Sequence, residues 1–284
     1  MARAIKQSGS CSTICGVGRN AEILEQALAE GVIDSWSQNP EEYCKNADLI
    51  IIGVPGLSVS KVLEDIERYL EEKTVLTDVA SVKSSTVEAV QNKLGSKGNK
   101  FVPGHPIAGS EQSGFFASRV DLFKNKRVIL TPLPENDPED VELLKKLWQK
   151  MDAEVIEMKV DHHDEVLAAT SHLPHLLAFA LVDTLSQHGE SEEIFRYAAG
   201  GFRDFTRIAS SDPVMWRDIF LANGEPTIKI LDDYMDDLKR LRSALENKEG
   251  EYFLETFSRA KQSRDKFMKL HQKIGVLGKP EENQ

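Results

Sequence analysis

Residues 12–20 read STICGVGRN, an apolar run that ends in glycine, valine, glycine and a basic residue. Such a run predicts a β-strand whose glycine turn leads into a helix, as in the dinucleotide-binding folds. The glycine fingerprint of those folds, G-x-G-x-x-G, requires a third glycine three positions after the second. Residue 21 is alanine, so the stretch is either a first strand with an incomplete fingerprint or a later strand of the sheet.

On the C-terminal side, short apolar runs alternate with amphipathic segments as far as about residue 160, which is the pattern of a parallel sheet with helical crossovers. We therefore predict an α/β, Rossmann-like doubly wound domain over residues 1–160. Its expected strands are residues 12–17, 48–54, 74–79, 101–104, 127–131 and 153–158. Its expected helices are residues 20–31, 58–70, 83–94 and 138–151.

The strand pattern ends near residue 161, and long segments with helical periodicity follow. We predict an all-α dimerisation domain over residues 161–284, because a pair of long amphipathic helices at its end is typical of a dimer interface. Packing of the same helices within one chain is the alternative. The expected helices are residues 161–187, 191–199, 212–222, 225–247 and 250–273.

The composition limits the class of protein. The chain has 284 residues, more than a single hydrophobic core usually holds. Its net charge of -11 argues against a nucleic-acid surface, which needs clustered Lys and Arg.

The three cysteines show no C-x-x-C spacing, as is typical of reduced thiols. The N-terminus has no secretory pattern, and LIIIGVPGL is too short to span a bilayer, so we expect a soluble cytoplasmic protein with no membrane partner.

The place of STICGV in the sheet affects the choice of cofactor. In a dinucleotide fold the second strand ends about 20 residues after the glycine loop, at the residue that contacts the adenosine ribose. If STICGV is that second strand, the loop falls before Met1 and residues 2–9 are the end of the preceding helix. Gly18 then leaves room at the ribose and Arg19 can pair with a 2′-phosphate. This favours NADP over NAD, with a solvated surface arginine as the alternative.

Three polar segments follow predicted strands, where doubly wound folds bind their ligands. Val54 ends the most apolar expected strand and Pro55 follows it. Proline turns the chain outward because it cannot donate to the sheet ladder. Ser81 stands between a strand and a helix, where capping of the helix also accounts for its hydroxyl. His105 follows a strand in a glycine-rich loop open to solvent, and an imidazole pKa near 6.5 suits a general base.

The helical region adds further polar candidates. His172 and His175 in SHLPHLLAF are three residues apart and share one helix face, and Pro174 predicts a kink there. No cysteine or carboxylate completes a zinc spacing, so we expect no metal. Farther on, GGFRDFTRIASSDPVMWRDIF gathers arginines near Trp216. Arg207 is suited to hold a substrate carboxylate, because a guanidinium binds carboxylates at two points.

Five segments occur in this order across both predicted domains: VPG (54–56), DVASVK (78–83), GHPIAGSEQSG (104–114), SHLPH (171–175) and GGFRDFTRIASSDPVMWRDI (200–219). Together they resemble the prephenate/arogenate dehydrogenase family of tyrosine biosynthesis over essentially all of residues 2–275. The resemblance implies a homodimeric, NAD(P)-dependent oxidative decarboxylase of prephenate or arogenate. It also implies a site in the cleft between a nucleotide-binding domain and a helical dimerisation domain.

By this resemblance, His105 accepts the proton of the substrate's C4 hydroxyl while hydride leaves C4 for the nicotinamide. Ser81 orients that histidine and the nicotinamide, Arg207 holds a substrate carboxylate, and His175 lines the same pocket. The resemblance carries over less strongly to two further substrate-binding residues, Ser110 and Trp216. The candidate cofactor-binding residues are Gly18, Arg19, Val54, Pro55 and Ser81.

The chain begins where the family has its first strand and glycine loop, so the expected Rossmann-like sheet has its first strand missing. We expect such a chain to bind NADP poorly or not at all, because the backbone cradle for the pyrophosphate is lost. One alternative is another NAD(P)-dependent dehydrogenase of a small carboxylate. Another is a non-catalytic dimeric remnant or regulatory paralogue. The sequence does not distinguish prephenate from arogenate as substrate.

Overall fold

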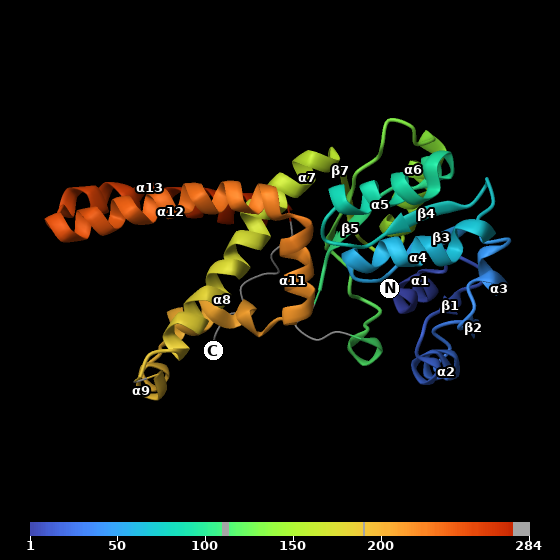
Figure 1. Ribbon diagram of the computed structural model, residues 1–284, viewed down its shortest axis with the longest axis horizontal. Coiled ribbons are helices and arrows are strands. Elements are labelled where there is room, and N and C mark those ends of the chain that lie inside the picture. The colour runs from blue at the N-terminus through green and yellow to red at the C-terminus, as the bar shows by residue number, and fades with distance from the viewer. Residues whose placement is uncertain (110–113, 190, 275–284) are drawn as a thin grey trace. The chain divides into compact units, whose positions relative to one another are not determined.

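The structure is a computed structural model that describes residues 1–109, 114–189 and 191–274 (Figure 1). It forms two compact units, residues 1–227 and 228–284. Every strand among the described residues belongs to the first unit. The expected domain boundary near residue 160 is a different division of the chain and stays a prediction.

The strands form three small sheets. In chain order they are β1 (Cys15–Val17), β2 (Ser35–Ser37), β3 (Leu49–Ile52), β4 (Val75–Asp78), β5 (Gly104–Ile107), β6 (Arg127–Leu130) and β7 (Glu154–Glu157). β1 pairs with β2 and β3 pairs with β4, both in parallel. β6 lies between an antiparallel β5 and a parallel β7. A parallel bridge from Leu76 to Phe101 links the second sheet to the residues just before β5.

Each helix expected from the sequence is present, with ends shifted by a few residues. The α-helices are α1 (Ala2–Ser8), α2 (Ala21–Ala29), α3 (Glu41–Cys44), α4 (Val59–Ile66), α5 (Ser84–Leu94), α6 (Pro138–Gln149), α7 (Val160–Leu167), α8 (Leu173–Ser186), α9 (Ser191–Arg196), α10 (Gly200–Thr206), α11 (Pro213–Ala222), α12 (Gly224–Asn247) and α13 (Gly250–Ile274). The shorter turns are the 3₁₀ segments η1 (Gly56–Ser58), η2 (Glu67–Tyr69), η3 (Gly95–Lys100), η4 (Phe115–Ala117) and η6 (Arg207–Ser210), and the π-helical segment η5 (Ala168–His172).

β5 differs from the prediction, which placed a strand at 101–104 and His105 in an open loop after it. The backbone N–H of Val102 donates to Leu76 (2.9 Å), and that of Thr131 donates to Pro103 (3.0 Å), so these residues already run beside β4 and β6. The regular ladder begins only at Gly104 and is antiparallel. His105 is therefore held inside a strand, and the expectation of a solvent-open loop was wrong.

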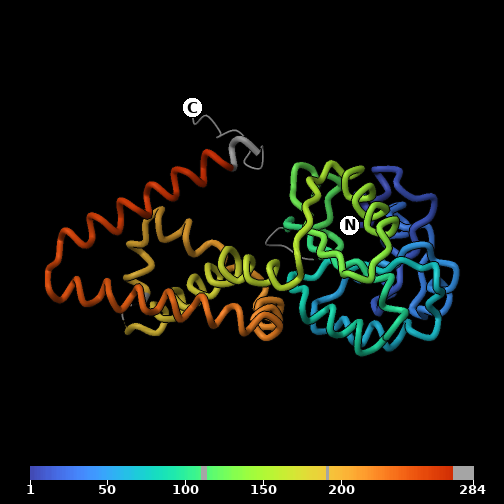
Figure 2. Tube along the Cα trace, turned by 90° about the horizontal axis from the view of Figure 1, so that it is seen from above, coloured from blue at the N-terminus to red at the C-terminus, as the bar shows by residue number. Residues whose placement is uncertain are grey.

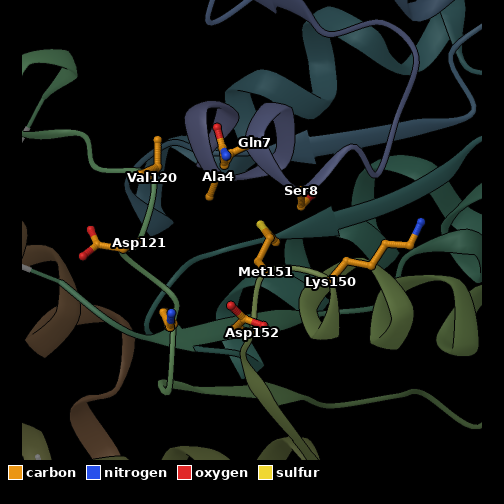
Figure 3. Close-up of a pocket in the computed structure, with 9 residues that line it drawn as sticks. Ala4, Gln7, Ser8, Val120, Asp121, Lys150, Met151 and Asp152 are labelled. Carbon is orange, nitrogen blue, oxygen red and sulfur yellow. The ribbon is translucent and has the colours of Figure 1, made fainter.

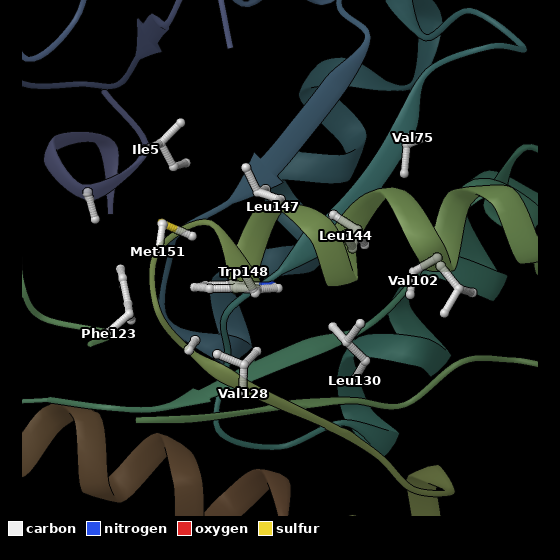
Figure 4. Packing of buried hydrophobic residues seen from close by; sticks show 13 residues of the cluster. Ile5, Val75, Val102, Phe123, Val128, Leu130, Leu144, Leu147, Trp148 and Met151 are labelled. Atoms are coloured by element: carbon white, nitrogen blue, oxygen red, sulfur yellow. The ribbon is translucent and has the colours of Figure 1, made fainter. Parts of the chain in front are cut away.

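The largest core cluster lies where α6 packs on the third sheet (Figure 4). Trp148 and Leu144 of α6 and Leu130 of β6 are each 0% exposed. Phe123 meets the edge of the Trp148 ring, with 5.1 Å between the ring centroids. Replacing a large buried side chain of this kind with alanine costs about 2–5 kcal/mol of unfolding free energy. The cluster thus holds β6 in place, and with it the neighbouring β5 that carries His105.

A continuous helix formed by α7, η5 and α8 is the only one among the described residues that is long and apolar enough by composition to cross a membrane. It carries three buried polar side chains, those of His163, Asp164 and His172. All three are hydrogen-bonded to other parts of the first unit. Such bonds are those of a helix inside a folded domain, so we interpret it as a structural helix and not as a membrane span.

The second unit is the helical hairpin made by most of α12 with α13, and Figure 2 shows the chain turning back between them. Lys248 in that turn has φ 58°, the left-handed conformation of a helix C-terminus. Large apolar side chains of both helices are more than half exposed in the single chain, including Ile228, Leu245, Leu254 and Phe257. Exposed apolar rows of this kind mark a surface for association.

Candidate active site

His105, which is 8% exposed, is the first of three side chains joined by hydrogen bonds. Nδ1 of His105 lies 2.8 Å from Nε2 of His163, and Nδ1 of His163 lies 2.7 Å from Oδ1 of Asp164. The two rings meet edge to face, with centroids 5.1 Å apart. His163 and Asp164 are 0% and 2% exposed by side chain. Strand β5 and helix α7 thus bring together residues 58 positions apart in the sequence.

The electrostatic surroundings keep His105 neutral. Burial lowers the pKa of His105 well below its ordinary 6.5, and the neighbouring His163 and Lys83 lower it further. His105 is therefore neutral at pH 7 and can accept a proton. Burial alone would raise the pKa of Asp164, but hydrogen bonds from His163, Ser84 and Lys83 outweigh burial and lower that pKa below its ordinary 3.8. Asp164 is therefore an ionised carboxylate, which only accepts hydrogen bonds.

The same carboxylate caps helix α5. Oδ1 of Asp164 accepts the backbone N–H of Lys83 at 2.9 Å, and Oδ2 accepts that of Ser84 at 2.8 Å. The N-cap residue Lys83 makes no side-chain cap of its own. Ser81, the capping candidate from sequence, precedes the helix by three residues, and its hydroxyl has no hydrogen-bond partner among the described residues. The cap comes from α7, and capping of α5 does not account for the Ser81 hydroxyl.

A buried ion pair fixes the ends of β4 and β5 next to each other. Nζ of Lys83 lies 2.5 Å from Oδ2 of Asp78 and 2.7 Å from the carbonyl oxygen of Gly104. Oδ1 of Asp78 accepts the backbone N–H of Gly104 at 3.1 Å. A Cβ atom at Gly104 would stand 3.1 Å from the carbonyl oxygen of Asp78, so the close approach leaves little room for a side chain. The residue before His105 is thus held by both members of the ion pair.

His172 and Asn223 form a second buried network beside α7. Nδ2 of Asn223 lies 2.9 Å from Nδ1 of His172 and donates to the carbonyl oxygen of Asp164, also at 2.9 Å. Since the amide nitrogen is a donor, Nδ1 of His172 is the acceptor and its proton is on Nε2. Burial lowers the pKa of His172 from its ordinary 6.5 to about 4, so this ring is neutral at pH 7.

The kink expected at Pro174 takes the form of a π-helical segment, η5, just before it. π segments of this kind are frequent at functional sites. Here the carbonyl oxygen of Ser171 accepts a hydrogen bond from Nδ1 of His175 at 2.8 Å. This leaves Nε2 of His175 as an acceptor. The ring stacks on Trp216, with centroids 3.7 Å apart and planes inclined by 22°.

Arg207 lies at the start of η6, in an exposed position. Burial is the main reason that the pKa of His175 is lowered, and the charge of Arg207 lowers it further, which places the guanidinium within electrostatic range of the imidazole. Arg203 differs, because its side chain is 82% exposed and pairs with the equally exposed Asp204 at 3.8 Å. The structure therefore brings His175, Trp216 and Arg207 into one neighbourhood.

The candidate cofactor residues lie after the parallel strands. Val54 and Pro55 follow β3, and Ser81 follows β4, whose last residue pairs with the last residue of β3. A Cβ atom at Gly56 would stand 3.9 Å from Cβ of Ala80, so these two loops are neighbours. The carboxyl ends of adjacent parallel strands, with small residues and exposed backbone, fit the nicotinamide end of a dinucleotide.

Gly18 and Arg19 follow β1, which belongs to a different sheet from β3. The side chain of Arg19 is exposed and makes no hydrogen bond or ion pair with any described residue. A Cβ atom at Gly18 would make only ordinary contacts with Leu24, at 3.7 and 3.8 Å. The loop therefore leaves a cation open to an anionic ligand, as a 2′-phosphate site requires.

Other features lie outside this group of residues. Ser110 is outside the described part of the chain. Within the described part, no group of three or more His, Cys, Asp or Glu residues is arranged to hold a metal ion. A pocket of about 170 Å³ is lined by residues of α1 and by residues from 120–124 and 150–152, none of which is a site residue. Figure 3 shows the side chains of this pocket. Its lining residues are Ala4, Gln7, Ser8, Val120, Asp121, Lys124, Lys150, Met151 and Asp152.

Sequence reasoning missed the residues that surround His105. His163 and Asp164 stand in DHHDEV, at the start of a helix assigned by periodicity alone. Their only signal in the sequence is that two polar residues stand side by side in an amphipathic segment. The structure shows that both are buried. Lys83 was passed over in the same way, as a charged residue at a helix start. Buried polar residues need partners, and the partners were too distant in sequence to be identified.

Two family models match the chain. The prephenate dehydrogenase nucleotide-binding domain matches residues 1–157, and the prephenate dehydrogenase dimerization domain matches residues 159–259. These matches confirm the predicted order of a Rossmann-like nucleotide-binding domain and a helical dimerisation domain.

Individual proteins agree with the family models. The chain is 37% identical to the prephenate dehydrogenase of Bacillus subtilis over 93% of its own length and 72% of the relative's. It is 33% identical to the cyclohexadienyl dehydrogenase of Zymomonas mobilis, over 93% and 90% of the two chains. The crystal structure of Aquifex aeolicus prephenate dehydrogenase with hydroxyphenyl propionate and NAD+ superposes with a TM-score of 0.86 at 36% identity, covering 94% and 93% of the two chains.

Proposed function

The chain belongs to the prephenate dehydrogenase family, and from this premise we propose which residues carry out the reaction. The enzyme is an NAD(P)-dependent oxidoreductase that converts prephenate, arogenate or both by oxidative decarboxylation. C4 is oxidised, carbon dioxide leaves C1, and the ring becomes aromatic. A bound NAD(P)+ would supply the hydride acceptor for this oxidation. The protein's own task is then to take one proton, hold an anion and orient the ring.

His105 is the base in this proposal. The single observation that carries it is the bond from Nδ1 of His105 to Nε2 of His163, which leaves Nε2 of His105 available for the C4 hydroxyl proton. The lowered pKa of His105 keeps that nitrogen unprotonated at neutral pH. Ser81, on the loop after β4, is proposed to orient the nicotinamide and the base, with Val54 and Pro55 on the neighbouring loop.

The substrate side of the proposal uses Arg207, His175 and Trp216. Arg207 holds a carboxylate, since a guanidinium gives two parallel, charge-assisted hydrogen bonds. His175 is fixed by its bond to Ser171 and its stacking on Trp216, so it presents a neutral acceptor nitrogen to the substrate. Ser110 is kept as a proposed substrate contact on the strength of the family resemblance alone.

An activity assay tests the reaction. The purified chain is mixed with prephenate or arogenate and with NAD+ or NADP+, and formation of the reduced cofactor is followed by absorbance. His105→Asn is expected to lower kcat by about 10²–10⁴-fold. His162→Asn, an exposed histidine on α7, is the control and keeps the activity. Calorimetry of cofactor binding, run in parallel, separates a loss of chemistry from weak cofactor binding.

The outcomes separate the alternatives. Binding of NAD(P) without turnover of either substrate would favour a non-catalytic dimeric protein. Turnover of another small carboxylate but not of these two would favour a different dehydrogenase.

We further propose NADP as the preferred cofactor, in a cytoplasmic homodimer. The exposed side chain of Arg19, which has no hydrogen bond or ion pair to a described residue, supports a 2′-phosphate contact beside Gly18. Arg19→Ala should raise KM for NADP+ by about 10-fold or more, the effect of losing one charged hydrogen bond, and leave KM for NAD+ nearly unchanged. An equal change of KM for NADP+ and NAD+ would show that Arg19 does not contact the 2′-phosphate.

A further inference from the structure

We propose that Asp164 is a positioning residue that sets the tautomer of His105 through His163 and at the same time holds the loop that carries Ser81. This rests on the proposed role of His105 as the base. The residues themselves form a continuous buried path from the carboxylate to the nitrogen that takes the substrate proton. Neither Asp164 nor His163 is placed against the substrate.

The first step is the direction of the bond between Asp164 and His163. An ionised carboxylate has no proton to donate, so Nδ1 of His163 is the donor across 2.7 Å. Three donors fix the plane of the carboxylate, since Lys83 and Ser84 bring their backbone N–H groups to 2.9 and 2.8 Å. The carboxylate therefore cannot turn away from His163 without uncapping α5.

The second step passes this choice to His105. With one proton on the His163 ring, and that proton at Nδ1, Nε2 of His163 is an acceptor. Nδ1 of His105 must then be the donor across 2.8 Å, and Nε2 of His105 carries the lone pair. If His163 had the opposite tautomer, Nε2 of His105 would already hold a proton and would be unable to accept another. Asp164 thus fixes the tautomer of His105 through His163, without contacting His105 itself.

The third step links the base to the cofactor side. Lys83 and Ser84, which Asp164 holds, come directly after the Ser81 loop. Lys83 reaches back to Asp78 and to Gly104, the residue before His105. One carboxylate therefore fixes the tautomer of the base and the position of the loop beside the nicotinamide. The proton stays on His105 after transfer, and Asp164 stabilises the resulting imidazolium through His163.

Substitutions at 163 and 164 separate this role from a purely structural one. In Asp164→Asn, an oxygen at the Oδ2 position keeps the bond from Ser84. The NH2 group at the Oδ1 position then faces Nδ1 of His163 and forces the opposite tautomer, and the cap bond from Lys83 is lost. We expect kcat to fall by about 10²–10⁴-fold, as in triads whose carboxylate becomes an amide, with little change in KM. Asp140→Asn is the control, because Asp140 is also buried and its carboxylate pairs with Lys100, which is not one of the site residues.

Position 163 gives the sharper comparison. His163→Gln places an amide oxygen near the former Nε2, which can accept from His105, so kcat should fall by about tenfold or less. His163→Leu removes the acceptor and should cost about 10²-fold or more. In the His163→Gln background the tautomer no longer depends on residue 164, so Asp164→Asn should cost less than about tenfold in kcat. Equal costs of Asp164→Asn in both backgrounds would overturn the proposal in favour of a structural role.

A readout independent of activity is the ring nitrogen spectrum of protein labelled with ¹⁵N-histidine. Free wild-type protein should show His105 protonated at Nδ1 and not at Nε2, and Asp164→Asn should reverse the two. A wild-type protein with the proton on Nε2 would refute the proposal. The expected tautomers in a protein without dehydrogenase activity would leave the inference standing and count against the proposed function alone.

Discussion

At the scale of single residues, the site depends on side chains whose charge is set by burial. His105 and His172 are neutral because burial disfavours the imidazolium. Asp164 stays ionised because donors surround it. Candidates such as His105 could be found from sequence, since a polar residue at the end of an apolar run is a local pattern in the sequence. His163 could not, because its importance comes from a partner 58 positions away.

The lowered pKa of His172 predicts a loss of stability in mild acid. The unfolded chain protonates this imidazole near 6.5, whereas the folded protein resists until about 4. Protonation therefore favours unfolding as the pH falls through this window, and a shift of this size corresponds to roughly 3 kcal/mol. Urea unfolding at pH 7 and pH 4.5, roughly the ends of the window, measures the loss. His172→Gln should show a smaller loss, whereas His162→Gln, at an exposed site, should behave as the wild type.

Arg207 gives a prediction for substrate binding. Arg207→Ala should raise KM for the substrate by about 10- to 100-fold with a smaller change in kcat, because a charged hydrogen bond to a carboxylate is lost. Arg207→Lys should recover part of this, since a lysine keeps the charge and loses the two-point geometry. Steady-state kinetics test both. Arg203→Ala is the matched control, and a similar KM effect there would contradict the special role of Arg207.

At the scale of elements, periodicity was enough to place the long helices and the apolar strands. It failed for β2, whose residues SWS carry no apolar run, and for β5, where the bonds to neighbouring strands decide the start of the ladder. The π segment before Pro174 was foreseen only as a kink. These misses share one cause, since each is decided by contacts with another element and not by the segment's own sequence.

The buried ion pair between Lys83 and Asp78 predicts a large effect on stability. Lys83→Met keeps much of the volume but leaves the carboxylate of Asp78 without its cation in a fully buried place. The expected cost is about 3–5 kcal/mol of unfolding free energy. Chemical denaturation measures this change. Lys93→Met on the same helix α5 removes a partly exposed pair with Glu64 and should cost less than about 1 kcal/mol. Equal costs would show that burial of the pair is unimportant.

At the scale of the whole molecule, the exposed apolar side chains of α12 and α13 predict a homodimer. Leu245 is 67% exposed in the single chain. If it lies in a two-fold interface, Leu245→Glu removes two buried leucines and should weaken dimerisation by about 100-fold or more. Sedimentation over a range of concentrations tests this. Leu143→Glu changes an exposed leucine on α6 and should leave the dimer intact. A wild-type monomer at high concentration would refute the prediction.

The cap of α5 by Asp164 also limits how such chains can be recombined. The boundary between the two family matches falls at residues 157–159, which makes it the natural crossover point for a chimera of two relatives. Yet His163, just beyond that point, contacts the proposed base His105, and Asp164 caps helix α5. Both His105 and α5 stand before the crossover. A hybrid joined there would inherit its base from one parent and the tautomer of that base from the other. With a crossover placed after α7, His105, His163 and Asp164 all come from the same parent protein.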